Sequence, residues 1–166
     1  MNYKAIFGIG LTTIAILIVF VWFGRPNNAV TSPEQSNTYE STLISQEASF
    51  DFGTISMAKG KVNHAYTVTN TGTEPVTVKK VYTSCMCTTA SLTSGEKIYG
   101  PFGMPGHAAV PSIDVSIATG ASVQVEVVFD PAAHGPAGIG LISRVVILEN
   151  SAGKSVEIAF TANVTP

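Results

Sequence analysis

Hydrophobic and polar positions follow two different patterns along this chain. Residues 6–23 are almost wholly apolar, and no charged residue occurs between Ala5 and Gly24. From about Ala48 onward, large apolar side chains recur at every second position, which is the period of β-strands with one buried face. The stretch between them, residues 26–46, contains few large apolar residues. The pattern predicts a membrane segment, a tether and a β-rich domain, in that order.

The N-terminal apolar run predicts a transmembrane helix within residues 1–25. About 20 apolar residues are enough to cross the ~30 Å hydrocarbon layer of a bilayer. Lys4 and Arg25 bracket the run, and the free α-amino group makes the N-terminal side slightly more positive, so we expect the N-terminus in the cytoplasm. A cleaved signal peptide is the alternative, but its apolar core is shorter, and residues 27–29 form a poor cleavage site. Both interpretations place the rest of the chain outside the cytoplasm.

Residues 26–46 are interpreted as a flexible tether. The segment is rich in Asn, Ser, Thr, Gln and Pro, so it cannot bury enough apolar surface to offset the entropy lost on ordering. A flexible chain of this length has an end-to-end distance of about 25 Å. The folded part is therefore expected to stand away from the bilayer, where it can meet nearby partners.

Residues 47–166 alternate as strands separated by turns. Ile139 to Leu148 is apolar on both faces, which favours a central strand, and the alternation slips by one residue at Lys79-Lys80, which predicts a β-bulge. Residues 150–154 are expected to form a hairpin turn. The aligned apolar positions of the clearest strands are Val62, His64, Tyr66 and Val68; Val123, Val125, Val127 and Phe129; and Val156, Ile158, Phe160, Ala162 and Val164. Roughly six or seven short strands in about 120 residues predict an all-β fold, an immunoglobulin-like antiparallel β-sandwich preceded by one N-terminal transmembrane helix.

Composition narrows the classes of function. Nine Lys and Arg against eleven Asp and Glu give a formal net charge of −2, and without a basic run this charge argues against nucleic acid as a partner. Carboxylates are scarce, and no nucleophile-elbow, phosphate-loop or zinc-protease motif occurs. We therefore expect a protein that is not an enzyme.

A Gly- and Pro-rich stretch, residues 93–112, interrupts the strand rhythm. Loops of this length in compact domains are usually functional or mobile. Tyr99 and Phe102 are its aromatic residues, and two interpretations remain open for them. They fold back to cover the open end of the sandwich, or they contact a ligand as part of a binding loop.

Both cysteines of the chain, Cys85 and Cys87, lie one residue apart at the end of a predicted strand. They have three interpretations. They can pack as small buried hydrophobes. They can form a disulfide, which would be strained and easily reduced if the strand is extended, because alternate Cα atoms then lie about 6.5–7 Å apart. In the third interpretation they bind Cu(I), which soft ligands select. The candidate ligands are then Cys85, Cys87, Met104 and His107, with His64 and His134 as extra candidates. His64 itself is better interpreted as a hydrogen-bonded core histidine, and no cofactor other than Cu(I) is indicated.

Four short motifs occur in one order: residues 50–55 (FDFGTI), 70–72 (NTG), 83–88 (TSCMCT) and 129–131 (FDP). On these motifs, residues 48–165 resemble the bacterial domain-of-unknown-function family 1573. The resemblance implies an immunoglobulin-type sandwich, akin to the Hydin and major-sperm-protein domains, with an N-terminal export signal in many members. It implies no activity. Two departures are the Met86 that replaces the family's usual Gly between the cysteines, and the longer Gly- and Pro-rich insert.

Together these features predict a membrane-anchored extracytoplasmic binding module whose partner is another extracytoplasmic protein. The alternative is a Cu(I)-binding or thiol-redox protein that uses the Cys85-Met86-Cys87 element.

Overall fold

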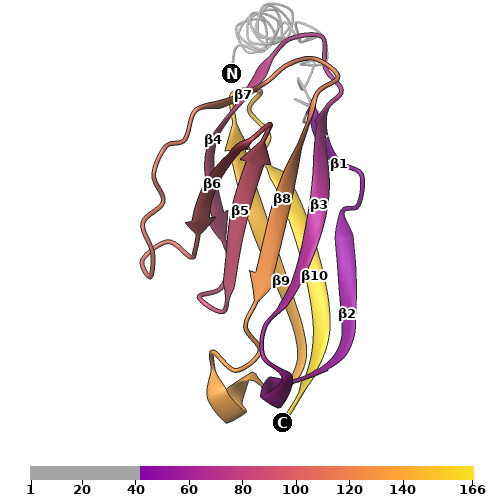
Figure 1. Ribbon diagram of the computed structural model, residues 1–166, viewed down its shortest axis with the longest axis vertical. Helices are drawn as coiled ribbons and strands as arrows, with labels where there is room; N and C mark the ends of the chain where they lie inside the picture. Colours follow the sequence, from indigo (N-terminus) through magenta and orange to yellow (C-terminus); the bar gives the residue numbers. More distant parts are fainter. Residues whose placement is uncertain (1–41) are drawn as a thin grey trace, which may run out of the picture. The chain divides into compact units, whose positions relative to one another are not determined.

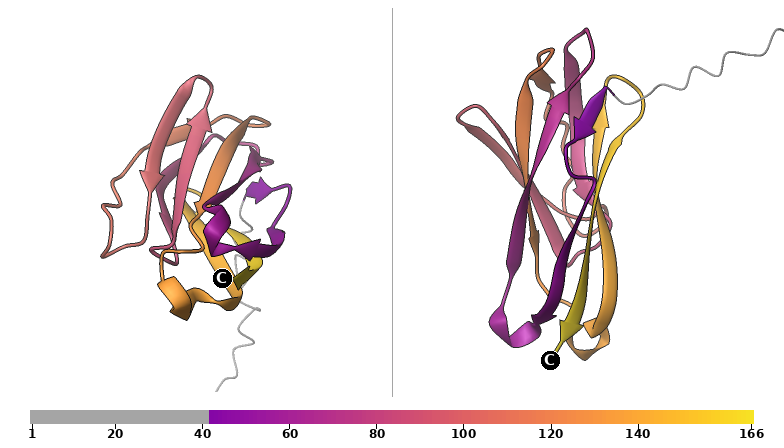
Figure 2. Two further views of the ribbon diagram at one scale, coloured as in Figure 1. Left: turned by 60° about the horizontal axis from the view of Figure 1, so that its bottom comes forward. Right: turned by 90° about the vertical axis from the view of Figure 1, so that its right-hand side faces the viewer.

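The structure is a computed structural model and describes residues 42–166. These residues form two facing β-sheets, as Figures 1 and 2 show. The elements are β1 (Leu43–Ser45), β2 (Ser49–Ser56), the 3-10 helix η1 (Met57–Lys59), β3 (Val62–Asn70), β4 (Val76–Thr83), β5 (Thr88–Ser94), β6 (Lys97–Phe102), β7 (Val115–Ile117), β8 (Ser122–Phe129), the 3-10 helix η2 (Gly135–Gly138), β9 (Gly140–Asn150) and β10 (Val156–Thr165). The predicted all-β sandwich is confirmed.

One sheet has the strand order β1-β3-β8-β5-β6 and is antiparallel throughout. The other has the order β2-β10-β9-β4-β7 and is mixed, because β2 pairs with β10 in parallel. The prediction of a wholly antiparallel sandwich is therefore wrong at this edge. The chain passes from β1 in one sheet to β2 in the other within three residues, and it keeps its direction as it does so (Figure 1).

The core lies between the sheets and is built from the alternating positions that the sequence indicates. Every second side chain of β8 and β10 is buried, from Val123 to Phe129 and from Val156 to Val164. Each fully buried aliphatic or aromatic side chain stabilises the fold by about 1.5–3 kcal/mol. The predicted bulge is present as a register shift between Val78 and Lys80. The predicted hairpin joins β9 to β10, and β9 lies inside its sheet as expected.

Asn70 explains why the NTG motif belongs to this fold. Its buried amide group donates to the carbonyl oxygens of Glu74 and Ile117, both at 2.9 Å, and its Oδ1 accepts from the Gly72 amide at 3.0 Å. A Cβ at Gly72 would lie 2.8 Å from Thr42 Cβ. Glycine is thus required at position 72 by the close approach of Thr42, and its φ is not positive.

Two predicted boundaries differ from the structure. Residues 43–45, assigned to the tether, form β1, and Leu43 is buried. The predicted loop over 93–112 is in its first half a hairpin, since β6 pairs with β5. The predicted anchor over 1–25 lies outside the described residues. Within residues 42–166, no helix is long and apolar enough to cross a membrane.

Candidate functional site

The TSCMCT motif forms the connection that leads from β4 in one sheet to β5 in the other. Ser84 exchanges two hydrogen bonds with the backbone of Val145: its amide donates to the carbonyl, and its hydroxyl accepts from the amide, both at 2.9 Å. The buried Thr83 hydroxyl lies 2.9 Å from the Cys85 carbonyl oxygen and 3.0 Å from that of Thr88, so both acceptors share its single proton. The threonines and the serine of the motif therefore hold the turn.

The two cysteines are joined by a disulfide, and both are almost completely buried, with 7 % of Cys85 and 3 % of Cys87 exposed. Their Cα atoms are 5.2 Å apart, inside the usual range of about 4.4–6.8 Å for bridged cysteines. The expectation of an extended pair at the limit of bridging distance is wrong, because the residues lie in a turn closed by the hydrogen bond from the Thr88 amide to the Cys85 carbonyl. Met86 does not have a positive φ, so this turn does not need glycine between the cysteines.

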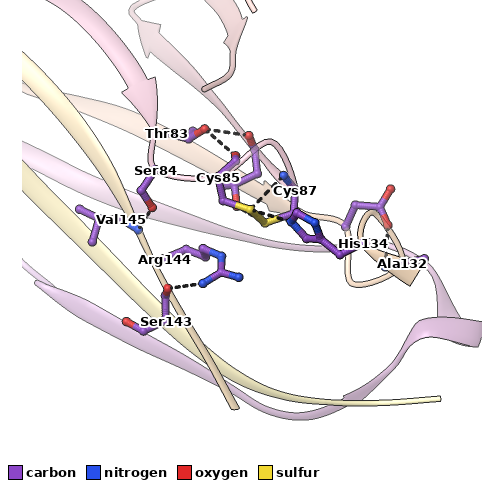
Figure 3. Close-up of a disulfide and its surroundings, with 11 residues drawn as sticks. Thr83, Ser84, Cys85, Cys87, Ala132, His134, Ser143, Arg144 and Val145 are labelled. Carbon is purple, nitrogen blue, oxygen red and sulfur yellow. Dashed lines mark hydrogen bonds between the residues drawn. A yellow bond between two sulfur atoms is a disulfide. The ribbon is translucent and has the colours of Figure 1, made fainter. Parts of the chain in front are cut away.

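A second turn brings His134 to the bridge. The Asp130 amide donates to the Cys87 carbonyl oxygen at 2.8 Å, and the Asp130 carboxylate accepts from the Ala132 amide at 3.0 Å. His134 Nε2 then lies 3.2 Å from Cys85 Sγ, as Figure 3 shows. Because a disulfide sulfur carries no hydrogen, the ring nitrogen is the donor of this hydrogen bond.

His134 also borders an open hollow of about 340 Å³ at this end of the sandwich. The hollow is lined in addition by Ile139, Leu141, Ser143 and Arg144, all beside or within β9. The Arg144 guanidinium donates through Nη1 to the Ser143 carbonyl oxygen at 2.8 Å. Figure 3 shows Arg144 beside the bridge and His134. The bridge is thus adjacent to a surface that carries both a cationic and large apolar groups.

The structure brings together three of the sequence-derived ligand candidates. The ligand atoms of Cys85, Cys87 and His134 all lie within 4.8 Å of one another. His107 is not part of this group; it is exposed, and its amide donates to the Met104 carbonyl oxygen in the loop after β6. Met104 is half-buried in the same loop.

His64 is hydrogen-bonded as the sequence indicates, but it is not a core residue, because its side chain is 24 % exposed. Its Nε2 lies 2.7 Å from Glu47 Oε2, and its ring stacks on Phe50 with the two ring centroids 3.6 Å apart.

His134 was only an auxiliary candidate because its position depends on pairing that is remote in sequence. Phe129 lies opposite Thr88 in the ladder between β8 and β5. That register places the residues after Phe129 beside those before Thr88, and so places His134 beside the cysteines. Two of the motifs that carry the family resemblance, TSCMCT and FDP, therefore meet at this site. The presence of both motifs in the sequence was the available signal for this contact.

The two aromatic residues proposed for binding have different surroundings. Phe102 is 4 % exposed and belongs to the core cluster, so it is not available to a ligand and the binding interpretation is wrong for it. Tyr99 is partly buried, and Lys97 Nζ lies 4.6 Å from its ring centroid. The strand pairing of β6 turns Phe102 inward, in agreement with the interpretation that these residues cover the sandwich.

The size of the bridged loop limits how much the disulfide can stabilise the fold. In the chain-entropy model, a disulfide that closes a loop of three residues reduces the entropy of the unfolded chain by only about 5.4 cal/mol/K, which corresponds to a stabilisation of ~1.6 kcal/mol at 25 °C. A loop of 15 residues would gain about 3 kcal/mol. Stability is therefore a weak reason for a bridge at this position.

Comparison with known proteins places these features in a family context. The family model described as "Protein of unknown function (DUF1573)" matches residues 43–99, which include both cysteines, so the predicted resemblance is confirmed over this segment. No curated protein matches the chain.

Two solved structures illustrate the similarity of fold. A protein of unknown function from Porphyromonas gingivalis W83 is 15 % identical with a TM-score of 0.53, over 73 % of this chain and 46 % of that chain. The PapD-like domain 7 of human CEP192 is 12 % identical with a TM-score of 0.46, over 80 % of this chain and 91 % of that domain. This chain thus spans less than half the length of the first of them. At 15 % identity the similarity to the first of them concerns the fold alone.

Proposed function

We propose that this protein is a membrane-anchored interaction module that acts outside the cytoplasm. Residues 1–25 hold it in the cell membrane as a single span with a cytoplasmic N-terminus, and the sandwich binds another extracytoplasmic protein. The Cys85–Cys87 disulfide supports this location, because disulfides form and persist in oxidising compartments and are rare in the cytosol.

The observation that carries the binding role is a group of exposed apolar side chains near the disulfide. Among residues 42–166, five large hydrophobic side chains are exposed. Two of them, Ile139 at 47 % and Leu141 at 88 %, line the hollow that His134 borders, and a third, Met86 at 49 %, lies between the two bridged cysteines. With His134 and Arg144 they make up what we call the bridge-end surface. Clustered exposed apolar groups bordered by polar ones mark sites of protein association.

Site-specific photocrosslinking in membranes tests this role. A crosslinking amino acid at position 141 is compared with one at position 98. Ile98 is also exposed, at 69 %, but it pairs with Thr93, at the end of β5 that is remote from the cysteines. We expect a discrete adduct from position 141 that is absent or much weaker from position 98. Equal adducts from both positions, or none from 141, would contradict the proposal.

Thiol–disulfide exchange is a second candidate, favoured by the contact between His134 and the bridge. An exchanging partner with two thiols would attack the bridge, form a mixed disulfide, and leave as its own disulfide after the second thiol attacks. Two electrons and two protons pass to Cys85 and Cys87. The hydrogen bond from His134 Nε2, 3.2 Å from Cys85 Sγ, would stabilise the charge that develops on this sulfur as the bond breaks.

Reduction of the folded protein by a series of dithiol buffers tests this candidate, with alkylation and mass measurement to count thiols. We expect two thiols to form reversibly, and His134→Ala to slow the reduction while His107→Ala leaves it unchanged. The candidate fails if thiols form only after the protein is unfolded.

A further inference from the structure

We propose that reduction of the Cys85–Cys87 bridge converts it into a Cu(I) site completed by His134. In the oxidised protein the two sulfurs are bonded to each other and are closed to the ion. In the reduced protein they become two soft ligands, and the His134 imidazole is the third. This inference rests on the second proposed function, in which a dithiol reduces the bridge.

The three ligand atoms already lie close enough for one ion. All are within 4.8 Å of one another, and the sulfur–nitrogen distance from Cys85 to His134 is 3.2 Å. Ligand bonds of about 2.0–2.3 Å place the donor atoms of a three-coordinate site roughly 4 Å apart. The sulfurs must therefore separate after reduction, but the imidazole is in place. The backbone that carries both cysteines, with Cα atoms 5.2 Å apart, keeps both sulfurs within reach of one ion.

The ligand set favours Cu(I) over other metals. Thiolate is the soft donor that selects Cu(I), and imidazole accepts copper as well. A structural zinc ion takes four protein ligands, whereas the cluster in residues 42–166 supplies three from Cys, His and acidic side chains. The cysteines are nearly buried and His134 is exposed, so the ion would enter from the His134 side and be held away from solvent.

A dithiol gives two electrons and two protons to the disulfide and becomes a disulfide itself. The proton on His134 Nε2 moves to Nδ1, which leaves Nε2 free to coordinate. Cu(I) then binds two thiolates and this imidazole nitrogen, and the two cysteine protons are released. Copper keeps its oxidation state throughout. A partner disulfide that reoxidises Cys85 and Cys87 takes up two electrons and two protons to become a dithiol, and the copper is released.

Copper transfer to the reduced full-length protein, kept in detergent without oxygen, tests the inference. The probe is the Cu(I)–bicinchoninate complex, whose colour fades when the protein takes the ion. We expect one equivalent to bind to the reduced protein and none to the oxidised protein. Cys85→Ser with Cys87→Ser should abolish uptake. His134→Ala should weaken binding at least 10-fold, whereas the matched variant His107→Ala should bind like the parent. X-ray absorption should show two sulfurs and one nitrogen.

The outcomes separate the two proposals. If thiol counting shows that the folded protein cannot be reduced, the thiol-exchange function fails, and the inference fails with it. If two thiols form but no copper is taken up, or if His134→Ala binds as tightly as the parent, the copper site alone is overturned. Uptake that is lost equally in His107→Ala would favour the ligand set with Met104 and His107.

Discussion

Reduction of the disulfide should destabilise the sandwich only slightly. The bridge closes a loop of only three residues. Its reduction therefore raises the conformational entropy of the unfolded chain by about 5.4 cal/mol/K and lowers the free energy of unfolding by ~1.6 kcal/mol. The turn keeps the hydrogen bonds of the Thr83 hydroxyl and the bond from the Asp130 amide to the Cys87 carbonyl. Those bonds do not depend on the bridge.

Urea unfolding of the full-length protein in detergent, followed by circular dichroism, measures this effect in the oxidised and the reduced states. Thr83→Val is the matched variant, because it removes the buried hydroxyl and keeps the bridge. Loss of a buried hydrogen bond costs about 1–3 kcal/mol, so we expect this variant to lose at least as much stability as reduction does. A loss above about 4 kcal/mol on reduction, or unfolding of the reduced protein without urea, would refute the reasoning and make the bridge a structural element.

Three further predictions concern the rest of the domain. Burial, and secondarily the Glu47 charge, raises the pKa of Tyr66 to about 12, whereas the same side chain in the unfolded protein ionises near pH 10. The folded state is therefore fully stabilised by the neutral phenol below pH 10, and up to about 2 kcal/mol of the free energy of unfolding is lost between pH 10 and 12. Tyr66→Phe should remove this pH dependence from the unfolding curves. Asn70→Ala leaves three backbone groups unpaired and should lower the free energy of unfolding in urea by about 2–4 kcal/mol. The loss should exceed that of the control variant Asn150→Ala, which removes similar hydrogen bonds near the surface. Equal losses of stability would contradict the role given to Asn70 in the NTG motif. Ile139→Asp should change the thermal unfolding midpoint little, because this side chain is 47 % exposed, but should remove the adduct that forms from position 141; a large fall in the midpoint would show that the residue is structural.

The strands were predictable because burial on one face imposes a period of two. The alternation from Val123 to Phe129 and from Val156 to Val164 survives intact in the structure. The bulge at Lys79-Lys80 was equally visible, since an inserted residue shifts every later side chain to the other face.

Long-range pairing explains what could not be predicted. The parallel placement of β2 on β10 and the contact between His134 and Cys85 both join segments that are distant in sequence, and local patterns do not report such pairing. For Phe102 the sequence leaves two interpretations open, because Gly and Pro around it conceal the strand that turns it inward. The separation of the cysteines was overestimated because a strand was continued through what is a turn.

Strand β9 is more exposed than its apolar sequence predicts. A segment that is apolar on both faces is usually covered on both, yet Leu141 is exposed. The apolar side chain that breaks the pattern lies on the bridge-end surface, which is why we assign this surface a partner. Departures from a folding pattern are often found where a protein has a function.

Thiol exchange and the copper site both require that the bridge opens while the sandwich stays folded. Counting alkylated thiols by mass in a dithiol series, with circular dichroism recorded on the same samples, measures this. We predict that two thiols appear on Cys85 and Cys87 with an unchanged β-sheet spectrum, and that they disappear again on oxidation. Thiols that appear only together with loss of the β-sheet signal would contradict it.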